Sequence, residues 1–489
     1  MSDYISLSQI PVIYHSLRKT FQAAKTKPIA WRRKQLLQLC RFAKENVRAI
    51  EECLFLDLGK PKQEALMSEI ASSIDCALHA AENVEKWARP EFVTTSQPWQ
   101  QAWNPRVEKH PKGVVLIISP WNLPFFLTIL PLCGAIAAGC CALIKPSEIT
   151  HHTSFFLAEN LLKYVDPDAF KVCLGGIPET TRILELRWDH ISYTGNSRVA
   201  RIISAAAAKH LTPLTLELGG KSPAIVDSTA NISISAKRIL WSKVGNAGQT
   251  CVAVDYVMVE KSILPDLIES LKDAYESFFP NNGGALKSES YARIVSDLHF
   301  ERLKDLLRQT DGEILFGGDW DSGHGQRQLE PTIVVGIKPG DMLMQEEIFG
   351  PILPIMAVEN VGEAIAYLST RPDSPLVVYI FSGSEQNIKK IITNTTSGNV
   401  TINDTIMQTS VKELPFGGVG ESGYGRVFGQ HTFDNFVYRR SITDIPYLNE
   451  PSSLGRYPPY TKESYEAFAG MLDISNPEVG EALVLKCHL

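Results

Sequence analysis

A long run without a charged residue, Gly113 to Ile144, constrains the fold more than any other feature of the sequence. Its length would suit a membrane span. Three prolines and Asn122 interrupt the run, however, and a lipid-facing helix would leave the freed backbone groups unpaired. The run instead predicts a buried strand at "GVVLIIS", a loop at "PWNLPF", a buried helix at "FLTILPLCGAIAAGC" and a strand at "CALIKP". Uniformly apolar strands are typical of a parallel sheet covered by helices on both faces.

The same alternation continues along the chain, which at 489 residues is too long for one core. The first ~90 residues read as helices. "FKVCLGG" and "HISYTG" extend the first series of strands, and we expect a second series to begin near "LTLELGG" and to run through "SPAIVD", "YVMVE", "PILPIMAV" and "LVVYIFS". The predicted fold class is therefore α/β, with a doubly wound parallel sheet followed by a second α/β domain.

Composition excludes several classes of protein. The net charge is −6, and no Lys/Arg block is dense enough for a nucleic-acid surface. The nine cysteines form no CxxC pairs, which argues against a zinc site or a disulfide framework and indicates a reducing compartment. The N-terminus has no apolar core of a signal peptide, and residues 441–489 hold no apolar span. We therefore expect a cytoplasmic protein with no integral membrane segment.

One cysteine stands in an unusual setting. Cys251 is approached through Gly-Asn-Ala-Gly-Gln-Thr, whereas Cys140 and Cys141 lie among aliphatic residues as structural cysteines do. None of the histidines has a comparably Gly-rich frame, but Glu217 in "LTLELGGKSP" does. An acid at the end of an apolar strand is costly to bury without a partner or a purpose. A carboxylate beside a thiol suggests a base that activates water, although a capped turn would also explain Glu217.

Two further stretches follow strands of the first sheet. Lys145 and Glu148 of "IKPSE" could hydrogen-bond ribose hydroxyls, but local spacing alone favours two solvated charges on an exposed loop. The usual G-x-G-x-x-G is absent; Gly195 alone stands between a strand and an Ala-rich helix. That turn is either a tight connection or a helix N-terminus that faces a pyrophosphate.

Together, "LELGGKSP", "NAGQTC", "EEIFGP" and "LPFGGVGESGYGR" resemble the motifs of the aldehyde dehydrogenase superfamily. The cysteine follows the glutamate by 34 residues, and the resemblance runs from roughly Ser6 to Tyr460. "HLTPLTLELGGKSP", "TCVAVDYVM", "KPSE" and "RYPPY" resemble the class 3 and fatty-aldehyde branch in particular.

The resemblance implies a role for each matching residue. Cys251 matches the nucleophile, Glu217 the base that activates water for thioester hydrolysis, and Asn122 the amide that stabilises the oxyanion together with the Cys251 N–H. The cofactor, NAD with NADP as the alternative, would be held by Trp121 and by residues that match the family's binding positions for each part of the cofactor. These are Lys145 and Glu148 for the adenosine ribose, Gly195 and Asn196 for the pyrophosphate turn, and Glu347 and Phe349 for the nicotinamide end. No metal site is expected.

Two positions depart from the family pattern. Ala200 stands where relatives have the second turn glycine, five residues after Gly195. Leu123 follows "PWN" where many relatives have an aromatic residue, which argues against an aromatic aldehyde. Leu123, Phe125 and Phe126 beside Asn122, with space at Gly245, favour a medium- or long-chain aliphatic aldehyde or another elongated apolar one; the phenylalanines could instead face the core.

The resemblance also implies three parts and a homodimer. We expect an NAD-binding domain at 1–91 and 111–214, a catalytic domain at 215–396, a bridging arm for dimerisation at 92–110 and 397–440, and a tail at 441–489. Two rival functions remain at this point. A CoA-acylating enzyme would pass the acyl group to CoA, which Glu217 argues against. A non-catalytic protein on the same fold would not need Cys251, Glu217 and Asn122 together.

Overall fold

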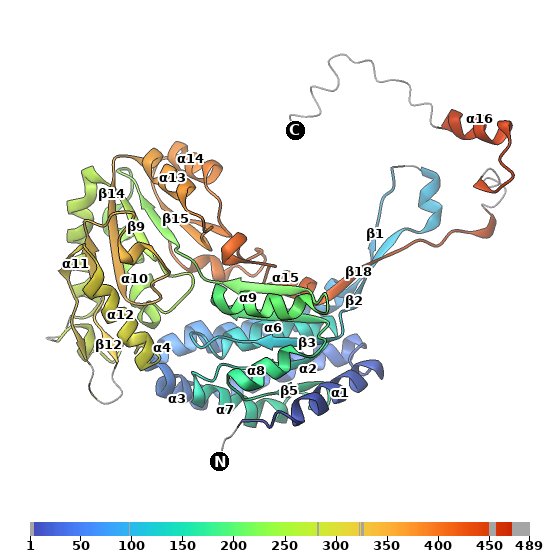
Figure 1. Cartoon of the computed structure of the whole chain (residues 1–489), viewed down its shortest axis with the longest axis horizontal. Coiled ribbons are helices and arrows are strands. Elements are labelled where there is room, and N and C mark those ends of the chain that lie inside the picture. The colour runs from blue at the N-terminus through green and yellow to red at the C-terminus, as the bar shows by residue number, and fades with distance from the viewer. Residues whose placement is uncertain are drawn as a thin grey trace. The chain divides into compact units, whose positions relative to one another are not determined.

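The computed structural model describes residues 4–96, 98–280, 283–321, 323, 327–448 and 456–471. The chain divides into two compact units, Met1–Ala88 with His110–Tyr438 and Arg89–Lys109 with Arg439–Leu489. The first unit holds both large sheets, shown with their helices in Figure 1. The predicted α/β class is confirmed.

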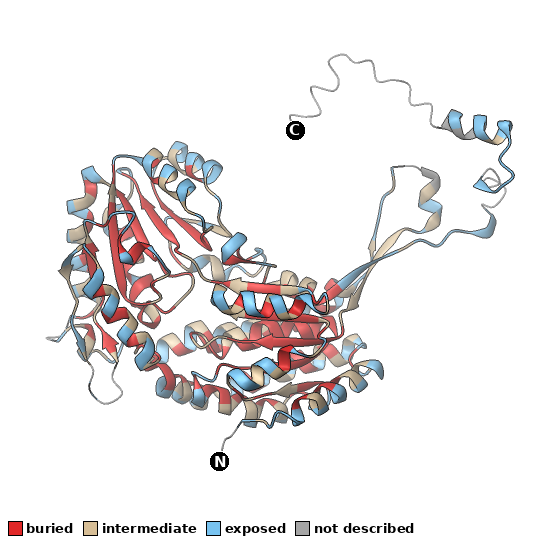
Figure 2. Ribbon diagram, viewed as in Figure 1, coloured by how far each residue is buried: buried red, intermediate tan, exposed pale blue. Residues whose placement is uncertain are grey.

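The six-stranded sheet has the order β17-β7-β6-β3-β4-β5, and all its strands are parallel except β17. Its strands and the helices of the same region are β3 (Val114–Ile118), α6 (Phe126–Ala138), β4 (Cys141–Lys145), α7 (His151–Asn160), β5 (Phe170–Val172), α8 (Ile177–Leu184), β6 (His190–Gly195), α9 (Ser197–Ala208), β7 (Leu214–Leu218) and β17 (Gly423–Tyr424). The uncharged run forms β3, α6 and β4 as predicted. Both strands are buried along their whole length, because helices cover both faces (Figure 2).

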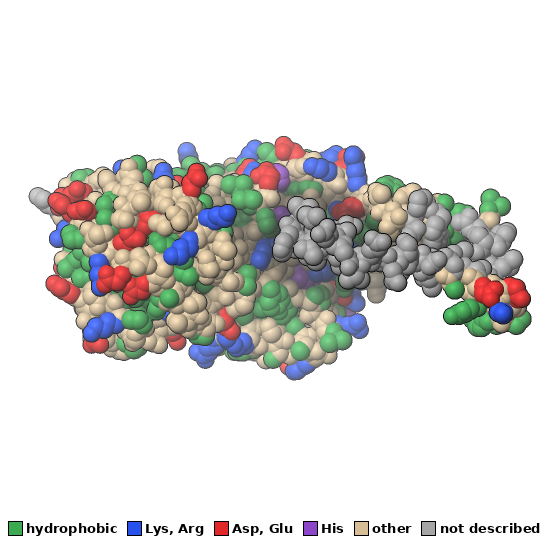
Figure 3. Space-filling model, turned by 90° about the horizontal axis from the view of Figure 1, so that it is seen from above, with side chains coloured by type: hydrophobic (Ala, Val, Ile, Leu, Met, Phe, Trp, Pro, Cys, Tyr) green, Lys and Arg blue, Asp and Glu red, His purple; other side chains and the backbone are tan. Residues whose placement is uncertain are grey.

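The N-terminal helices share one hydrophobic core with this sheet. They are α1 (Gln9–Gln22), α2 (Ile29–Glu45), α3 (Val47–Leu58), α4 (Lys62–Ala65), the π-helix η1 (Leu66–Ala71) and α5 (Ser72–Ala88). Among the described residues, no helix is long and apolar enough to cross a bilayer. On the face drawn in Figure 3, basic and acidic side chains are interspersed.

The seven-stranded sheet has the order β10-β13-β14-β9-β8-β15-β16, with only β10 antiparallel to its neighbour. The elements of this region are β8 (Pro223–Val226), α10 (Ile232–Val244), β9 (Tyr256–Glu260), α11 (Leu264–Phe278), α12 (Asp297–Gln309), β10 (Glu313–Phe316), β11 (Trp320–Asp321), β12 (Gln328–Leu329), β13 (Thr332–Val335), β14 (Ile352–Val358), α13 (Val361–Thr370), β15 (Val377–Phe381), α14 (Glu385–Asn394) and β16 (Asn399–Ile402). A second hydrophobic core surrounds this sheet.

Two predicted boundaries differ from the structure. Residues 214–218 form β7, which pairs with β6 and so belongs to the first sheet rather than opening the second. The predicted arm segment 397–440 is not one piece: β16 extends the ladder of β15, β17 pairs with β7, and α15 (Gly429–Asn435) packs against α6. An apolar strand pattern shows that a strand exists but not which sheet it joins.

The second unit is smaller. Most of a three-stranded sheet, β1 (Glu91–Phe92), β2 (Arg106–Pro111) and β18 (Val437–Ile442), lies in it, together with the 3₁₀ turn η2 (Pro98–Trp103) and α16 (Lys462–Met471). The Glu91 carboxylate accepts from Lys109 at 2.8 Å and also pairs with Arg439, which lowers its pKa to about 2. The rest of the predicted tail, 449–455 and 472–489, lies outside the described residues.

Candidate active site

The strand order of the six-stranded sheet creates a switch point between β3 and β6. From β3 the chain proceeds to β4 and β5 on one side, and then returns to β6 and β7 on the other. Ligands of doubly wound sheets bind at the carboxyl ends of the strands beside such a point. The segment that carries Trp121 and Asn122 follows β3 there, and Gly195 and Asn196 end β6.

Several predicted cofactor residues lie at this edge. Lys145 ends β4 and is buried, and its amine pairs with the exposed Glu148. Asn196 caps α9: its side-chain oxygen accepts from Val199 N at 2.9 Å. The first N–H groups of this 12-residue helix therefore face the edge, as the N-terminus of a phosphate-binding helix does.

The approach to Cys251 is a left-handed turn after α10. Asn246, Ala247 and Gly248 have φ angles of 51°, 50° and 72°. A Cβ at Gly248 would lie 2.3 Å from the carbonyl oxygen of Gly350, so the glycines of "NAGQTC" and "EEIFGP" lie against each other. The small residues before Cys251 thus allow two backbone segments to meet at the thiol.

Cys251 itself is half-buried, at the edge of the second hydrophobic core. The pKa of its thiol is raised to about 12, first by burial and then by the charges of Glu347 and Glu217, while the backbone N–H groups of Cys251 and Val252 partly oppose this rise. Those two N–H groups therefore point toward negative charge on or near the sulfur. Tyr379, which sequence analysis missed, fixes this segment by donating its hydroxyl to Val252 O at 2.5 Å.

Glu217 projects from β7 into a buried environment. Neither carboxylate oxygen has a hydrogen-bond partner among the residues that the structure describes. Burial raises the pKa of Glu217 well above its ordinary value, and the charge of Arg426 opposes that effect. The predicted alternative, a turn capped by this side chain, is therefore not what the structure shows. A buried, unpartnered carboxyl group near a thiol is typical of a functional site.

Glu347 lies against the two glycines that follow Glu217. A Cβ at Gly219 would lie 2.0 Å from Glu347 Oε2, and the N–H of Gly220 stabilises the ionised carboxylate. Burial first, and the charge of Asp255 second, raise the pKa of Glu347 to about 8. The motifs "LELGG" and "EEIFGP", 130 positions apart at Glu217 and Glu347, thus meet in space.

A buried ion pair that the sequence analysis did not predict holds the segment 343–348, which precedes Phe349, in place. Lys221 pairs with Asp255 and donates to Leu343 O at 2.7 Å and Glu346 O at 2.9 Å. Asp255 accepts from Ile348 N at 2.9 Å. Local sequence gave no signal for this clamp beyond the apolar context of "VAVDY".

Phe349 and Trp121 are in direct aromatic contact. Phe349 has a φ of 50°, and its ring meets that of Trp121 edge-on with centroids 5.2 Å apart. The other side of Trp121 contacts His299 at 4.9 Å. Two predicted cofactor residues from distant motifs thus lie in contact.

Asn122 is buried. Its backbone carbonyl accepts from Asn246 Nδ2 at 3.0 Å and from Lys60 Nζ at 3.3 Å. No hydrogen bond among the described residues uses its side-chain amide, which is thus available to a ligand.

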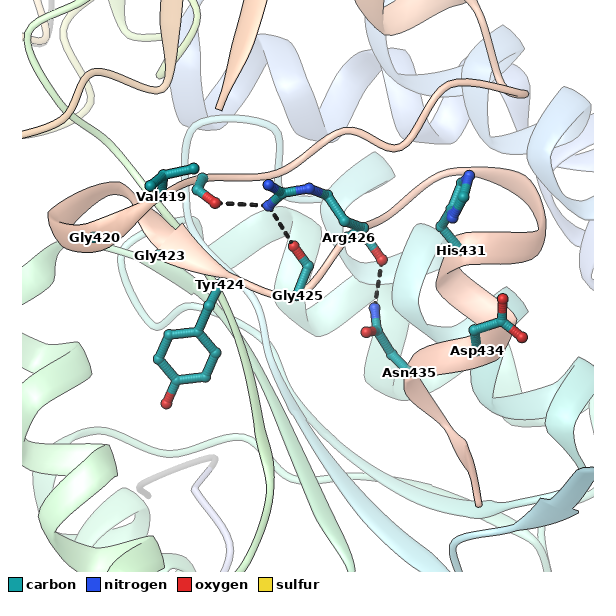
Figure 4. A pocket seen from close by; sticks show the side chains of 10 residues that line it. Val419, Gly420, Gly423, Tyr424, Gly425, Arg426, His431, Asp434 and Asn435 are labelled. Atoms are coloured by element: carbon teal, nitrogen blue, oxygen red, sulfur yellow. Dashed lines mark hydrogen bonds between the residues drawn. The ribbon is translucent and has the colours of Figure 1, made fainter. Parts of the chain in front are cut away.

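The Gly-rich segment from Gly418 to Gly425 contributes to the lining of an open pocket beside β7 (Figure 4). Arg426 donates to Gly418 O at 2.6 Å and to Gly425 O at 2.8 Å. The Tyr424 side chain is directed away from the Arg426 guanidinium (Figure 4). Gly423 pairs directly with Glu217 across β17 and β7. This loop therefore brings the Arg426 charge close to Glu217, a relation that the motif alone did not reveal.

These features are those of an oxidoreductase built on a dinucleotide-binding fold, and sequence comparison agrees. Residues 5–442 match the Aldehyde dehydrogenase family, to which the chain therefore belongs. It is an oxidoreductase that oxidises aldehydes with NAD(P). The residues at the switch point fit such a cofactor, because an amine, a carboxylate and free helix N–H groups meet at one edge.

Individual relatives lie in the predicted class 3 branch. The chain is 42% identical over 453 residues to the rat "Aldehyde dehydrogenase, dimeric NADP-preferring", covering 93% of this chain and 98% of the relative. It is 43% identical over 446 residues to mouse "Aldehyde dehydrogenase family 3 member A2", covering 91% and 90%. The solved structure of a Staphylococcus aureus enzyme, "Substrate bound state of Staphylococcus Aureus AldH", is 38% identical with a TM-score of 0.86, covering 91% and 98%. The predicted resemblance is confirmed.

Proposed function

We propose that this enzyme oxidises an aldehyde through a covalent intermediate on Cys251. The meeting of one thiol with two buried carboxyl groups, Glu217 and Glu347, carries the proposal. The sulfur bonds to the carbonyl carbon and its proton leaves to a nearby base. The carbonyl oxygen becomes an oxyanion, which accepts hydrogen bonds from the Cys251 N–H and the Asn122 amide. NAD(P), held by the residues at the switch point and by Glu347 and Phe349, would supply the two-electron oxidation by hydride removal that converts this adduct into a thioester on Cys251.

Glu217 completes the cycle in this proposal. An unpartnered carboxyl group with a raised pKa is suited to take a proton from water. The hydroxide oxygen bonds to the thioester carbon, the C–S bond breaks, and the carboxylate product leaves. Each turnover consumes aldehyde, water and oxidised cofactor, and yields carboxylate, reduced cofactor and two protons.

Two variants test these roles. Cys251→Ala should abolish NADH formation, whereas Cys53→Ala, another half-buried cysteine, should retain it. Glu217→Gln should release about one NADH per subunit in a burst and then turn over slowly, because the thioester accumulates. Full turnover by Cys251→Ala, or an unchanged steady rate with Glu217→Gln, would contradict the assignment.

Formation of acyl-CoA by the wild type with added CoA would favour the CoA-acylating alternative.

The substrate that the site suits best is an elongated apolar aldehyde. Phe126 is half-buried and stacks on Phe428 with centroids 6.5 Å apart, next to the core that borders Cys251. A Cβ at Gly245 would meet nothing within 4 Å, which leaves room before the thiol. Phe125 was expected beside them but is fully buried against Phe42, so it belongs to the core.

Chain length is the variable that tests this substrate class. Each added CH₂ that is buried contributes about 0.8 kcal/mol, so kcat/KM should rise about fourfold per carbon until the apolar space is filled. The measurement is a series of straight-chain aldehydes from acetaldehyde to hexadecanal. A maximum at two or three carbons would contradict the proposal.

We further propose that NAD is the preferred cofactor. Glu148 is exposed at the end of β4, where a carboxylate can accept from free ribose hydroxyls but repels a 2′-phosphate. The rat relative is named NADP-preferring, so the comparison does not favour this choice. A higher kcat/KM with NADP than with NAD would overturn it.

A cytoplasmic homodimer is the proposed state in the cell. The rat relative is described as dimeric. The eight cysteines within the described residues are free thiols, which suits a reducing compartment. Cell fractionation with a detergent-free extraction would test the location.

A further inference from the structure

The backbone carbonyl of Asn122 joins two loops that are far apart in the sequence. It accepts from Asn246 Nδ2 at 3.0 Å on the side of the Cys251 loop. On the other side it accepts from Lys60 Nζ at 3.3 Å. Both donors are buried, so neither bond competes with bulk water.

Asn246 is committed to this joint at a cost. Its φ of 51° lies in the left-handed region, and its side-chain oxygen is buried with no partner among the described residues. A buried acceptor without a hydrogen-bond partner destabilises the folded state. The same Nδ2 also donates to Gln249 O at 3.0 Å, and its backbone N–H donates to Glu64 Oε2 at 2.9 Å. A glycine at position 246 would adopt the same left-handed backbone and would bury no side-chain oxygen. The hydrogen bonds that the Asn246 amide nitrogen donates are therefore what offsets the cost of the buried oxygen.

The opposite side of the joint is rigid. Lys60 and Glu69 form an ion pair at 2.5 Å, and both side chains are completely buried. The second oxygen of Glu69 accepts from Phe125 N at 2.9 Å and Phe126 N at 3.0 Å, where α6 begins. Asn122 is therefore held against the N-terminal helices, and Asn246 can set the position of the Cys251 loop relative to it.

We infer that Asn246 is a positioning residue, whose amide ties the Cys251 loop to the Asn122 loop so that thiol and Asn122 amide face the same carbonyl group. This inference rests on the proposed function, because the geometry matters when the oxyanion forms. A displacement of about 1 Å between reacting groups can reduce the rate about 100-fold. The effect of Asn246 would therefore fall on the step that forms the thiohemiacetal and transfers hydride, rather than on cofactor binding.

Two variants remove the donor in different ways. Asn246→Gly keeps the left-handed backbone and removes the amide, whereas Asn246→Asp keeps the size and replaces the amide nitrogen with oxygen. In either variant, single-turnover NADH formation should fall about 10- to 100-fold. A primary isotope effect from aldehyde deuterated at the carbonyl carbon should appear on the steady rate. The dissociation constant of NAD should stay within about twofold.

A double-mutant cycle separates positioning from general structural damage. In an Asn122→Ala background, Asn246→Gly should reduce the single-turnover rate by less than about threefold, because its effect passes through Asn122. The matched control is Asn231→Gly, which removes the cap of α10, where Ile234 N donates to Asn231 Oδ1 at 3.2 Å. This variant should leave hydride transfer unchanged.

The outcomes distinguish this inference from the proposed function. If Cys251→Ala is inactive but both Asn246 variants transfer hydride at the wild-type rate, or if the cycle is additive, the inference is wrong and the proposed function stands. Turnover by Cys251→Ala would overturn the proposed function itself. If Asn246→Gly does not fold, the near-isosteric Asn246→Asp provides the same comparison.

Discussion

At the level of single residues, the ionisable groups of the site, Glu217, Glu347 and Cys251, are all in surroundings that favour their neutral, protonated forms. Glu217 and Glu347 both have raised pKa values, and both raise the pKa of Cys251. In the free protein near pH 7 the thiol is therefore protonated, and Glu347, with a pKa of about 8, is largely neutral. Activation of the sulfur thus requires a proton to leave the site as substrate and cofactor enter.

The raised pKa of Glu347 predicts a pH dependence of stability. Its ordinary value is 4.5 and its folded value about 8, so between these pH values the folded state binds more protons than the unfolded state. Stability therefore falls as pH rises through this window. Glu347→Gln should remove this component, worth on the order of a few kcal/mol by pH 8.

Thermal unfolding of the cofactor-free protein from pH 5 to 8.5 provides the measurement. The Tm of the wild type should fall more steeply than that of Glu347→Gln, with the variant more stable at the alkaline end. Glu346→Gln, at an exposed neighbouring position, is the control and should follow the wild type. Parallel curves for wild type and Glu347→Gln would show that this carboxyl group is not strained by burial.

The sequence predicted candidate site residues such as Cys251 and Glu217, but it did not predict the hydrogen bonds and ion pairs that position the loops around them. The setting of Cys251 and the strand-end acid Glu217 are local signals, and the structure brings both to one site. The joint of Asn246 with Asn122 and the clamp of Lys221 with Asp255 depend on partners 124 and 34 positions apart. No local pattern encodes such pairs, because each partner alone is an ordinary polar residue in a loop.

At the scale of elements, apolar continuity predicted the parallel strands well. The predicted strands at 113–119, 141–146, 190–195 and 376–382 all form. Short, glycine-rich strands were not predicted: β17 comprises only Gly423 and Tyr424, and it forms because β7 presents a partner edge. Sheet membership is a property of such pairing, which explains why β7 and β16 were assigned to the wrong regions.

Helix α6 offers a test of how closely its region is packed. Gly134 in its middle faces α15, and a Cβ there would lie 2.5 Å from Thr432 Cγ2 and 2.8 Å from Thr432 O. Gly134→Ala would gain up to about 1 kcal/mol of helix propensity but overpack the contact by about 1–3 kcal/mol. A lower Tm is therefore expected. Gly340→Ala, where a Cβ would meet nothing within 4 Å, should leave the Tm unchanged. An unchanged or raised Tm for Gly134→Ala would show that α15 yields.

At the scale of the whole molecule, an edge strand offers a surface for the proposed homodimer. β16 is the last strand of the seven-stranded sheet, and among the described residues its one strand partner is β15. Its exposed side chains include Val400 and Ile402, at 37% and 44% exposure. An open strand edge with apolar side chains is a template for pairing with another chain, and proteins protect such edges with charge when they remain free. The absence of lysine on β16 therefore favours a second copy as its cover.

Replacing both apolar residues with lysine tests whether this edge is the dimer contact. The double variant Val400→Lys with Ile402→Lys would place two positive charges per chain at the interface. Because burying these charges is costly, the variant should sediment as a monomer rather than a dimer in sedimentation velocity. Val12→Lys on α1, a position that is 66% exposed, is the matched control and should remain a dimer. Because Cys251, Glu217 and Asn122 all belong to the first unit of one chain, the monomer should still give the initial burst of NADH. A double-lysine variant that sediments as a dimer would exclude β16 as the contact and leave the remaining surfaces of the chain to account for it.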